Sequence, residues 1–355
     1  MKRKTEVLVV GAGISGCAAA QELQANNIDY LLIERNVKSG GLTRSISLGN
    51  AHFDYTGHFL HLARLRSPEE IPYAKQHNKD WQLIKRKSVV YVEDTVVPAP
   101  FQYNLFALPE KTKNHCINDY RNRPIIDTPN SFREYLLSGF GQGMCDTFLY
   151  PYNEKMQAID LNDLSVDAVK RFFPVPDEQK IEKGYSKSQN NGAVGYNSCF
   201  WYPKKNGIGK LAKGLAVGLD SLLTCYPVEK LDLNKKVAYT PLEEIHYNKV
   251  ITSIPLKEFS NYCVMPELQQ LSSSLSHNKV LCVNILVKGS FNKDFQGCHW
   301  IYVPDKAIPF YRVGIYSNLP DNITPANHTS IYVEVAKPSK KPINNLCMPE
   351  NKSKV

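Results

Sequence analysis

The sequence lacks the features of a membrane-spanning protein and of a disulfide-stabilised one. No apolar run approaches the ~20 residues that a membrane-spanning helix requires. The nine cysteines are odd in number, scattered and without a Cys-x-x-Cys pair, which argues against a disulfide framework and against a zinc site. We therefore expect reduced thiols, a cytoplasmic location, no bound metal and no integral membrane segment.

Motifs for several kinds of catalysis are also missing. The chain has no Gly-x-Ser-x-Gly nucleophile elbow, no His-Glu-x-x-His zinc motif, no P-loop lysine and no cysteine in a recognisable nucleophile setting. The lysines are dispersed and not interleaved with aromatic residues, so no motif indicates nucleic-acid binding. Any difficult chemistry would therefore belong to a bound cofactor.

The chain does contain a dinucleotide-binding turn near its start. Residues 6–10 form a mostly apolar, β-branched run, as expected for a strand buried on both faces. Gly11 then allows a tight turn, Gly13 lets the backbone approach a pyrophosphate, and Gly16 lets the next helix pack closely. The start of that helix would present unpaired amides to the phosphates.

Two further features complete the dinucleotide-binding pattern, and the second of them favours FAD over NAD as the cofactor. Residues 30–34 form a second apolar run that ends in Glu34, about where a carboxylate holds a ribose hydroxyl. Gly40, Gly41 and Arg44 add a Gly-Gly-x-x-Arg element. The residues expected to bind the cofactor are Gly11, Gly13, Ser15, Gly16, Glu34, Gly40, Gly41, Arg44 and Val228. The formal net charge of +9 suits an anionic ligand such as a nucleotide diphosphate, although a solvated basic surface would give the same charge.

The sequence patterns predict an α/β fold, with a Rossmann-like FAD-binding domain and an inserted helical and antiparallel-sheet substrate domain. Residues 1–69 and 201–260 are expected to form the FAD-binding domain. Residues 70–200 would form the helical part of the substrate domain and residues 261–336 its sheet part, followed by a polar tail over 337–355.

Three local patterns support this division. Ser131-Phe-Arg-Glu134 is a capping-box signature that predicts a helix over 132–139, which the glycines of residues 140–144 should break. Residues 211–223 form an amphipathic stretch. Four apolar, alternating runs between residues 280 and 335 predict an antiparallel sheet that forms a ligand-facing wall.

Five segments, taken together, resemble one family in the same order along the chain. They are the dinucleotide turn with Gly40-Gly41, Asp54–His58, Val97–Asn104, Pro151–Lys155, and His299–Pro304 with Phe310–Val313 and Ser317-Asn318. This combination resembles the eukaryotic-type UDP-galactopyranose mutases, within the superfamily of FAD-dependent amine oxidases and protoporphyrinogen oxidases. The resemblance implies an FAD enzyme that interconverts the pyranose and furanose forms of a UDP-sugar through an adduct at the reduced flavin N5. It leaves open whether NAD(P)H or another donor reduces the flavin.

The resemblance also implies roles for three residues of the second and third segments. His58 would lie over the flavin near its reactive edge, as the catalytic-site residue. Phe101 and Gln102 would hold a uracil ring by stacking and by hydrogen bonding. The alternatives are that His58 is only a polar loop residue and that Phe101 is only a core aromatic.

The later segments would contribute the sugar and diphosphate ligands. Asn153 would contact the sugar or a phosphate, or would only cap its helical segment. Tyr302 and Arg312 would bind the diphosphate, with Arg171 as a second arginine or as an ordinary exposed helix end. Because Arg312 lies in an apolar strand, its burial requires an anionic ligand or a carboxylate.

Two departures from the family pattern leave the function open. Gln157 stands where the family has a tryptophan, so the sugar is not defined. After Ala336 nothing matches the family's closing Gly-Arg-x-Gly segment, so we expect a truncated member. The alternatives are an FAD-dependent oxidoreductase of the amine-oxidase, protoporphyrinogen-oxidase or desaturase type, and a non-catalytic flavin or nucleotide binder. The sequence does not predict the oligomeric state.

Overall fold

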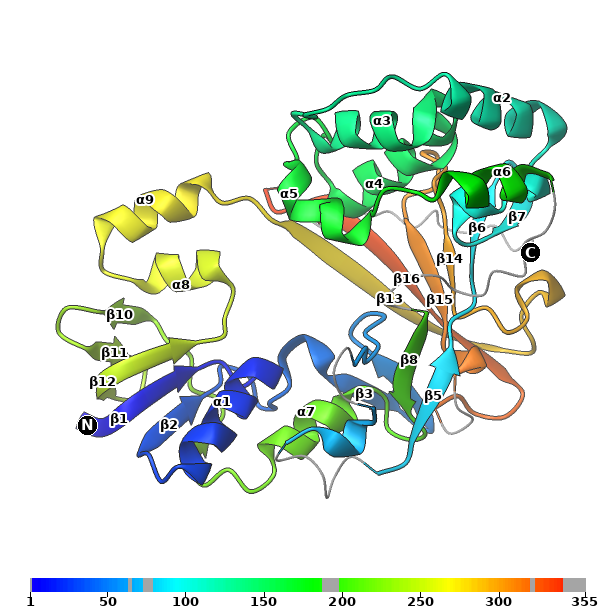
Figure 1. The fold of residues 1–355 in the computed structure, drawn as a ribbon. Coiled ribbons are helices and arrows are strands. Elements are labelled where there is room, and N and C mark those ends of the chain that lie inside the picture. Colours follow the sequence, from blue (N-terminus) through cyan, green and yellow to red (C-terminus); the bar gives the residue numbers. More distant parts are fainter. Residues whose placement is uncertain (1, 63–65, 73–78, 187–197, 320–322, 341–355) are drawn as a thin grey trace. The chain divides into compact units, whose positions relative to one another are not determined.

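A computed structural model describes residues 2–62, 66–72, 79–186, 198–319 and 323–340, apart from the side chain of Arg171. The chain divides into two compact units, each assembled from separate segments (Figure 1). Unit 1 contains residues 1–84, 199–276 and 319–326, and unit 2 contains residues 85–198, 277–318 and 327–355. Within the described residues, no helix is both long and apolar enough to cross a membrane.

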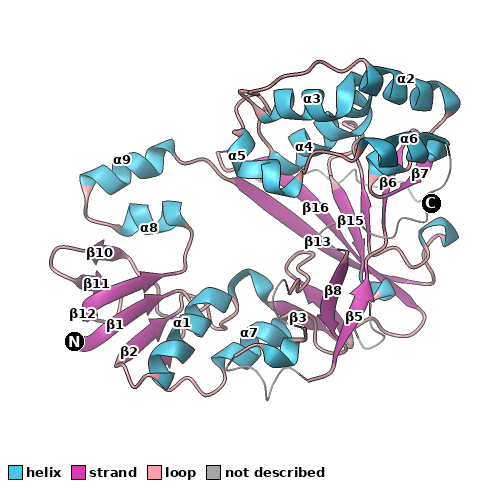
Figure 2. Ribbon diagram, viewed as in Figure 1, coloured by secondary structure: helices cyan, strands magenta, loops and turns pink. Residues whose placement is uncertain are grey.

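Unit 1 is built on a six-stranded sheet (Figure 2). Its strand order is β10 (Lys230–Asp232), β11 (Val237–Tyr239), β12 (Glu244–Thr252), β1 (Lys2–Val10), β2 (Tyr30–Ile33) and β9 (Leu222–Leu223). Strand β1 pairs in parallel with both β12 and β2, and β2 pairs in parallel with β9. This parallel centre confirms the Rossmann-like part of the predicted fold.

Helices pack on both faces of this sheet. Successive residues of β1 point to opposite faces, and because residues 7–10 are apolar, both faces offer hydrophobic side chains to helices. The helices of unit 1 are α1 (Ile14–Ala25), α7 (Gly209–Ala216), α8 (Leu256–Tyr262) and α9 (Pro266–Ser274). Val7 and Val9 pack in one cluster with α1 and α7, whereas Leu8 and Val10 pack in another with α8 and α9. Gly11 follows this buried strand directly, so the strand positions the glycine turn.

Two smaller strand pairs complete unit 1. They are β3 (Ser45–Leu48) with β4 (Ala51–Asp54), and β5 (Trp81–Lys85) with β8 (Cys199–Pro203). The second pair places the end of the first segment at residue 84, beyond the predicted 69. Packing of α8 and α9 on the sheet likewise carries the second segment to 276, beyond the predicted 260. Residues 319–326 also belong to unit 1, where the Ile323 carbonyl accepts a bond of 2.9 Å from the His52 amide.

Unit 2 contains a second six-stranded sheet, covered by helices. Its strand order is β13 (Asn278–Lys288), β16 (His328–Pro338), β15 (Arg312–Ile315), β14 (Trp300–Tyr302), β6 (Ser88–Val92) and β7 (Thr95–Pro98). The four predicted runs are β13 to β16 and pair antiparallel, as expected, while β6 pairs in parallel with β14. The helices are α2 (Glu110–Arg121), α3 (Phe132–Met144), α4 (Tyr150–Gln157), α5 (Val166–Val169) and α6 (Glu178–Ser186).

The local helix predictions had different outcomes. Helix α3 begins at Phe132, where the Ser131 hydroxyl accepts a bond of 3.3 Å from the Glu134 amide. Its geometry is interrupted at Gly141, at φ 76° and ψ 161°, so the predicted break is confirmed. The amphipathic stretch over 211–223 is not one helix, because α7 ends at Ala216 and Leu222–Leu223 instead form β9 beside β2.

Candidate functional site

A cavity of about 510 Å³ in unit 1 surrounds the glycine turn. The predicted cofactor residues that line it are Gly11, Gly13, Ser15, Glu34, Gly40, Gly41, Arg44 and Val228. Residues that sequence analysis did not single out, including Asn36, Tyr226 and Ser253, complete the wall. The fold thus gathers residues from the turn, from the second glycine pair and from the 226–228 segment around one space.

Gly16 and Gly13 of the turn lack a side chain for different structural reasons. A Cβ atom at Gly16 would lie 1.8 Å from the Gly11 carbonyl oxygen, so this position is a close helix–turn contact and does not line the cavity. A Cβ at Gly13 would meet nothing nearer than the Gly41 Cα at 4.0 Å. The backbone of Gly13 is extended, at φ −73° and ψ −175°, which any residue can adopt. The absent side chain at 13 therefore keeps the cavity open.

The start of α1 is a site for an anion. Gly13 is its N-cap and provides no side-chain hydrogen bond, and the first turn contains no acidic residue. The amides before Cys17, which donates to the Gly13 carbonyl at 2.9 Å, have no partner within the helix. These donors and the positive end of the helix dipole favour a phosphate group.

Glu34 is buried beside this turn and is partly satisfied by the protein. One carboxylate oxygen accepts from the Ala12 amide at 2.9 Å. The other accepts from the Asn36 amide at 2.9 Å and from the Asn36 side chain at 2.6 Å. A carboxylate offers about four acceptor positions, so Glu34 has capacity for one more donor, such as a hydroxyl group.

Unit 2 contains a separate cavity of about 450 Å³. Four predicted ligand residues line it, namely Phe101, Gln102, Tyr302 and Arg312. Tyr302 and Arg312 are directly opposite one another on the antiparallel strands β14 and β15, so the register of this strand pair brings them together. Burial raises the pKa of the Tyr152 hydroxyl, another wall residue, so this group remains a protonated donor.

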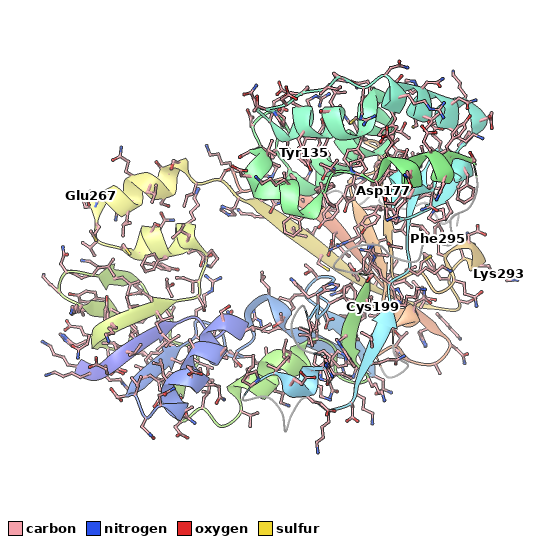
Figure 3. All side chains as sticks on the ribbon, viewed as in Figure 1. Tyr135, Asp177, Cys199, Glu267, Lys293 and Phe295 are labelled. Carbon is pink, nitrogen blue, oxygen red and sulfur yellow. The ribbon has the colours of Figure 1, made fainter. Side chains whose placement is uncertain are left out.

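Aromatic side chains form much of the wall of this cavity. Phe101 is buried and packs on Phe148 with ring centroids 5.0 Å apart, so it is part of the core as well as of the wall. The segment 172–174 also lines the cavity. The hydroxyl of Tyr135 on α3, labelled in Figure 3, donates a hydrogen bond to the Phe173 carbonyl and so fixes this segment.

Arg312 is paired with a carboxylate inside unit 2. Its Nε donates to Glu334 at 2.7 Å and its Nη2 donates to the other oxygen at 2.9 Å. Glu334 is fully buried at 0% exposure, and it lies opposite Arg312 on β16. The carboxylate alternative foreseen for Arg312 is therefore present, and a diphosphate contact remains a prediction.

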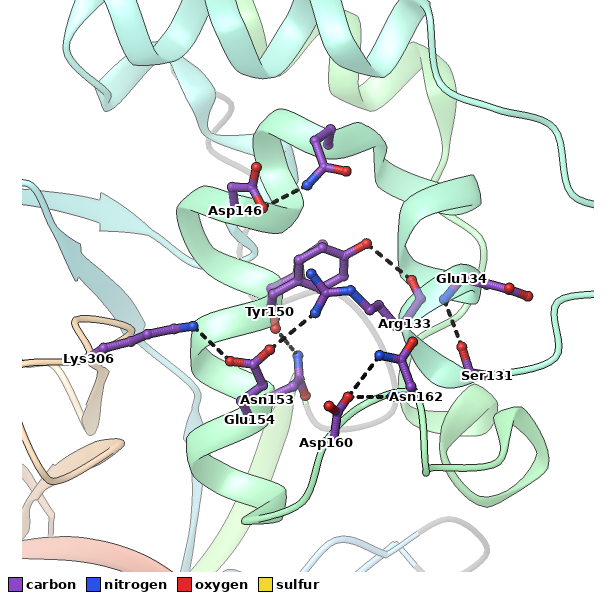
Figure 4. A network of polar contacts seen from close by, with 12 residues as sticks. Ser131, Arg133, Glu134, Asp146, Tyr150, Asn153, Glu154, Asp160, Asn162 and Lys306 are labelled. Atoms are coloured by element: carbon purple, nitrogen blue, oxygen red, sulfur yellow. Dashed lines mark hydrogen bonds and ion pairs between the residues drawn. The ribbon is translucent and has the colours of Figure 1, made fainter.

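Of the other two predicted ligands, Asn153 does not line this cavity. Asn153 is fully buried, and its side-chain amide donates to the Leu149 carbonyl at 2.7 Å, one turn earlier (Figure 4). Its Oδ1 atom has no partner among the described residues. Arg171 lies in a short 3₁₀ turn, and its side chain is outside the described part of the chain.

His58 lies in the loop after β4 and lines neither cavity. The hydroxyl of Thr56 lies 2.6 Å from its Nδ1, and the His58 amide donates to the Thr56 carbonyl at 2.8 Å. The loop therefore fixes the ring, and its predicted place over a flavin stays a prediction.

A third hollow, of about 400 Å³ in unit 2, is a poor candidate for the same ligand. Its wall includes the carboxylates of Glu93, Asp94, Asp146 and Asp305, against the single lysine Lys306. This acidic lining would repel a diphosphate.

Comparison with known proteins agrees with the fold. Residues 9–67 match the family described as NAD(P)-binding Rossmann-like domain. The structure resembles that of reduced UDP-galactopyranose mutase with a TM-score of 0.89 and 25% sequence identity, over 96% of this chain and 76% of that one. The chain has the fold of a UDP-galactopyranose mutase.

Two other known proteins are also similar to this chain. The dTDP-fucopyranose mutase of Escherichia coli is 24% identical over 216 residues, which cover 55% of this chain and 52% of the relative. The match thus spans about half the length of that relative. Wild-type putrescine oxidase bound to putrescine shares the fold at a TM-score of 0.63 and 16% identity, over 95% of this chain and 76% of that one. The resemblance to UDP-galactopyranose mutase seen in the sequence is confirmed, and the likeness to putrescine oxidase shows a shared fold.

Sequence analysis of this mutase-like chain missed one charged wall residue of the unit-2 cavity, Arg86. It lies between Lys85 and Lys87 in a basic run that resembles an ordinary solvated turn. The available signal was the apolar strand that begins two residues later at Ser88, since a side chain entering such a strand can point inward.

Asp54 holds the loop of His58 to the rest of unit 1. Its carboxylate accepts bonds from the Ser45 hydroxyl at 2.5 Å, the Tyr202 hydroxyl at 2.6 Å and the Ile208 amide at 3.0 Å. Burial raises the pKa of Asp54 from its ordinary 3.8 to about 6.

Asp54→Asn should lower the free energy of unfolding by about 1–3 kcal/mol, because the new amide would place its own donors against groups that already donate. Between pH 4 and 6 the native Asp54 binds a proton that the unfolded carboxyl releases, so wild-type stability falls as the pH rises through this window. The deficit of the variant should therefore be larger at pH 4.5 than at pH 7.5 in urea denaturation. Asp80→Asn is the matched control, because that side chain is 70% exposed. An equal deficit at both pH values would contradict the protonation of Asp54.

Proposed function

We propose that this mutase-like chain binds FAD in the unit-1 cavity and a UDP-sugar in the unit-2 cavity, and interconverts the pyranose and furanose forms of the sugar. The observation that carries the proposal is the TM-score of 0.89 with UDP-galactopyranose mutase, against 0.63 for putrescine oxidase. The curated relative is likewise named a mutase of a nucleotide-linked sugar.

The residues of the unit-1 cavity fit FAD. The open space at Gly13 and the free amides at the start of α1 would receive the pyrophosphate, and Glu34 would accept a ribose hydroxyl. Arg44 donates to the Gly41 carbonyl at 3.0 Å and stacks 4.7 Å from the Tyr55 ring, which fixes the second glycine pair around the cofactor. When bound and reduced, the flavin would supply a nucleophile for covalent catalysis at the anomeric carbon. NAD(P)H or another donor would supply the electrons.

The unit-2 cavity would hold the nucleotide during the reaction. Phe101 would stack on the uracil ring and Gln102 would hydrogen-bond its edge, while Tyr302 would donate to the diphosphate together with Arg312. The paired Glu334 keeps the guanidinium of Arg312 in one orientation. Holding the departing UDP beside the sugar would make its return effectively unimolecular.

One sample can test this function against an oxidase. The protein is loaded with FAD, reduced with dithionite under nitrogen, and incubated with UDP-galactopyranose or UDP-galactofuranose, and the products are separated by anion-exchange chromatography. The mutase proposal predicts each form from the other, and no oxygen uptake when putrescine is offered in air to a second portion of the FAD-loaded protein that has not been reduced. Oxygen uptake with an amine, and no interconversion, would instead support an oxidoreductase. Failure to retain FAD would favour the non-catalytic binder.

A further inference from the structure

The wall of the unit-2 cavity includes a buried arginine, Arg86, for which the described residues provide no ion-pair partner. Arg86 is only 9% exposed, although Lys85 and Lys87 on either side of it are exposed. Its backbone is fixed by a bond of 2.9 Å from its amide to the Ser198 carbonyl. Its Nε atom is buried and has no hydrogen-bond partner among the described residues.

The surroundings of Arg86 do not replace the missing partner. Its guanidinium lies 5.9 Å from the centre of the Trp300 ring, a distance at which a cation–π contact is weak. In the part of the chain that the structure describes, no carboxylate lines this cavity and no ion pair involves Arg86. The other arginine of the wall, Arg312, is already paired with Glu334.

An unpaired buried arginine is unfavourable unless something else compensates it. A planar guanidinium is a strong bidentate donor to phosphate oxygens. The wall around Arg86 offers aromatic surface and neutral donors but no anion, so the compensating charge would come from the ligand.

We infer that Arg86 is a further anion-binding residue of the unit-2 cavity, and that it pairs with phosphate oxygens of the ligand in addition to the contact proposed for Arg312. This inference rests on the proposed function, because it takes the ligand to be a nucleoside diphosphate. The same chemistry would also attract free pyrophosphate, and the experiment below separates the two.

Isothermal titration of the purified full chain with UDP, uridine and pyrophosphate tests the inference. Arg86→Met should weaken UDP and pyrophosphate binding by about 10- to 100-fold while leaving uridine affinity unchanged. Lys85→Met removes the same charge from an exposed neighbour and should change none of the three affinities more than about twofold. Arg86→Lys should recover part of the loss, since it restores the charge without the bidentate fork.

A second readout excludes a merely structural role. Because Nε of Arg86 has no hydrogen-bond partner and its guanidinium no ion pair among the described residues, Arg86→Met should leave the midpoint of thermal unfolding unchanged or raise it. A lower midpoint with an unchanged ratio of UDP to uridine affinity would show that Arg86 only supports packing, and would overturn the inference. UDP binding that is unchanged in Arg86→Met would overturn it too, without touching the proposed function. A wild-type protein that binds neither UDP nor pyrophosphate would overturn both the inference and the proposed function. A wild-type protein that binds pyrophosphate as tightly as UDP would support the role of Arg86 in anion binding and contradict recognition of the nucleoside.

Discussion

Replacing Gly13 with valine should abolish the retention of FAD while the protein stays folded. A Cβ atom at this position meets nothing nearer than 4.0 Å, and the backbone is in a region that valine favours, so folding is unaffected. The side chain would instead occupy the cavity in front of the first amides of α1. Loss of two charge-assisted hydrogen bonds to the pyrophosphate corresponds to about 3 kcal/mol, or roughly 100-fold in affinity.

The measurement is the visible absorbance of the protein after incubation with FAD and desalting, together with its circular dichroism. Gly16→Ala is the matched control, because its Cβ would lie 1.8 Å from the Gly11 carbonyl oxygen and should disturb the fold itself. We expect a folded, colourless Gly13→Val protein and a destabilised Gly16→Ala protein. A folded Gly13→Val protein that retains FAD as well as wild type would show that the cofactor, if any, does not lie on this turn.

Replacing Arg312 with methionine should cost about 3–5 kcal/mol of the free energy of unfolding, because it leaves the fully buried carboxylate of Glu334 without its partner. The double variant Arg312→Met/Glu334→Met removes both charges and should recover most of this loss, to within about 1–2 kcal/mol of wild type. Arg121→Met is the matched control: the Arg121–Glu182 pair is half-exposed, so the cost should stay below about 1 kcal/mol. Guanidinium denaturation measures all three.

The stabilised double variant also separates the two roles of Arg312. If Arg312 also contacts the diphosphate, UDP affinity should fall about 10-fold in the double variant even though its stability is recovered. Unchanged UDP affinity in this folded protein would remove Arg312 from the ligand contacts and leave it a purely structural role. No recovery of stability in the double variant would contradict the account of the buried pair.

The unit-1 cavity was the more predictable part of the structure. The strand, the three glycines and Glu34 lie within 34 residues of the start, so local spacing alone determines which of them meet. Residues Asn36 and Ser253 were missed for different reasons. Asn36 is a turn residue without a motif, and Ser253 reaches the turn only because β12 pairs in parallel with β1.

The unit-2 cavity depends on pairings that the sequence does not display. Arg312 meets Glu334 because the register of β15 and β16 sets them opposite each other, and an alternating apolar pattern predicts two strands without fixing that register. Arg86 was missed because it lies in a run of basic residues, and the side chains of such residues are rarely buried. Asn153 shows the reverse situation: its side-chain amide bonds to the preceding helical turn, and its contact with a sugar or phosphate stays a prediction.

The most direct test of the account is the number of furanose molecules formed for each pair of electrons supplied. FAD-loaded protein is reduced with a limiting, measured amount of dithionite under nitrogen and then incubated with excess UDP-galactopyranose. An isomerase that needs a reduced flavin but transfers no net electrons should form UDP-galactofuranose in large excess over the dithionite consumed, up to the equilibrium ratio. A yield of no more than one product per electron pair, or no furanose from fully reduced and folded protein, would contradict the proposal that this chain is a nucleotide-sugar mutase.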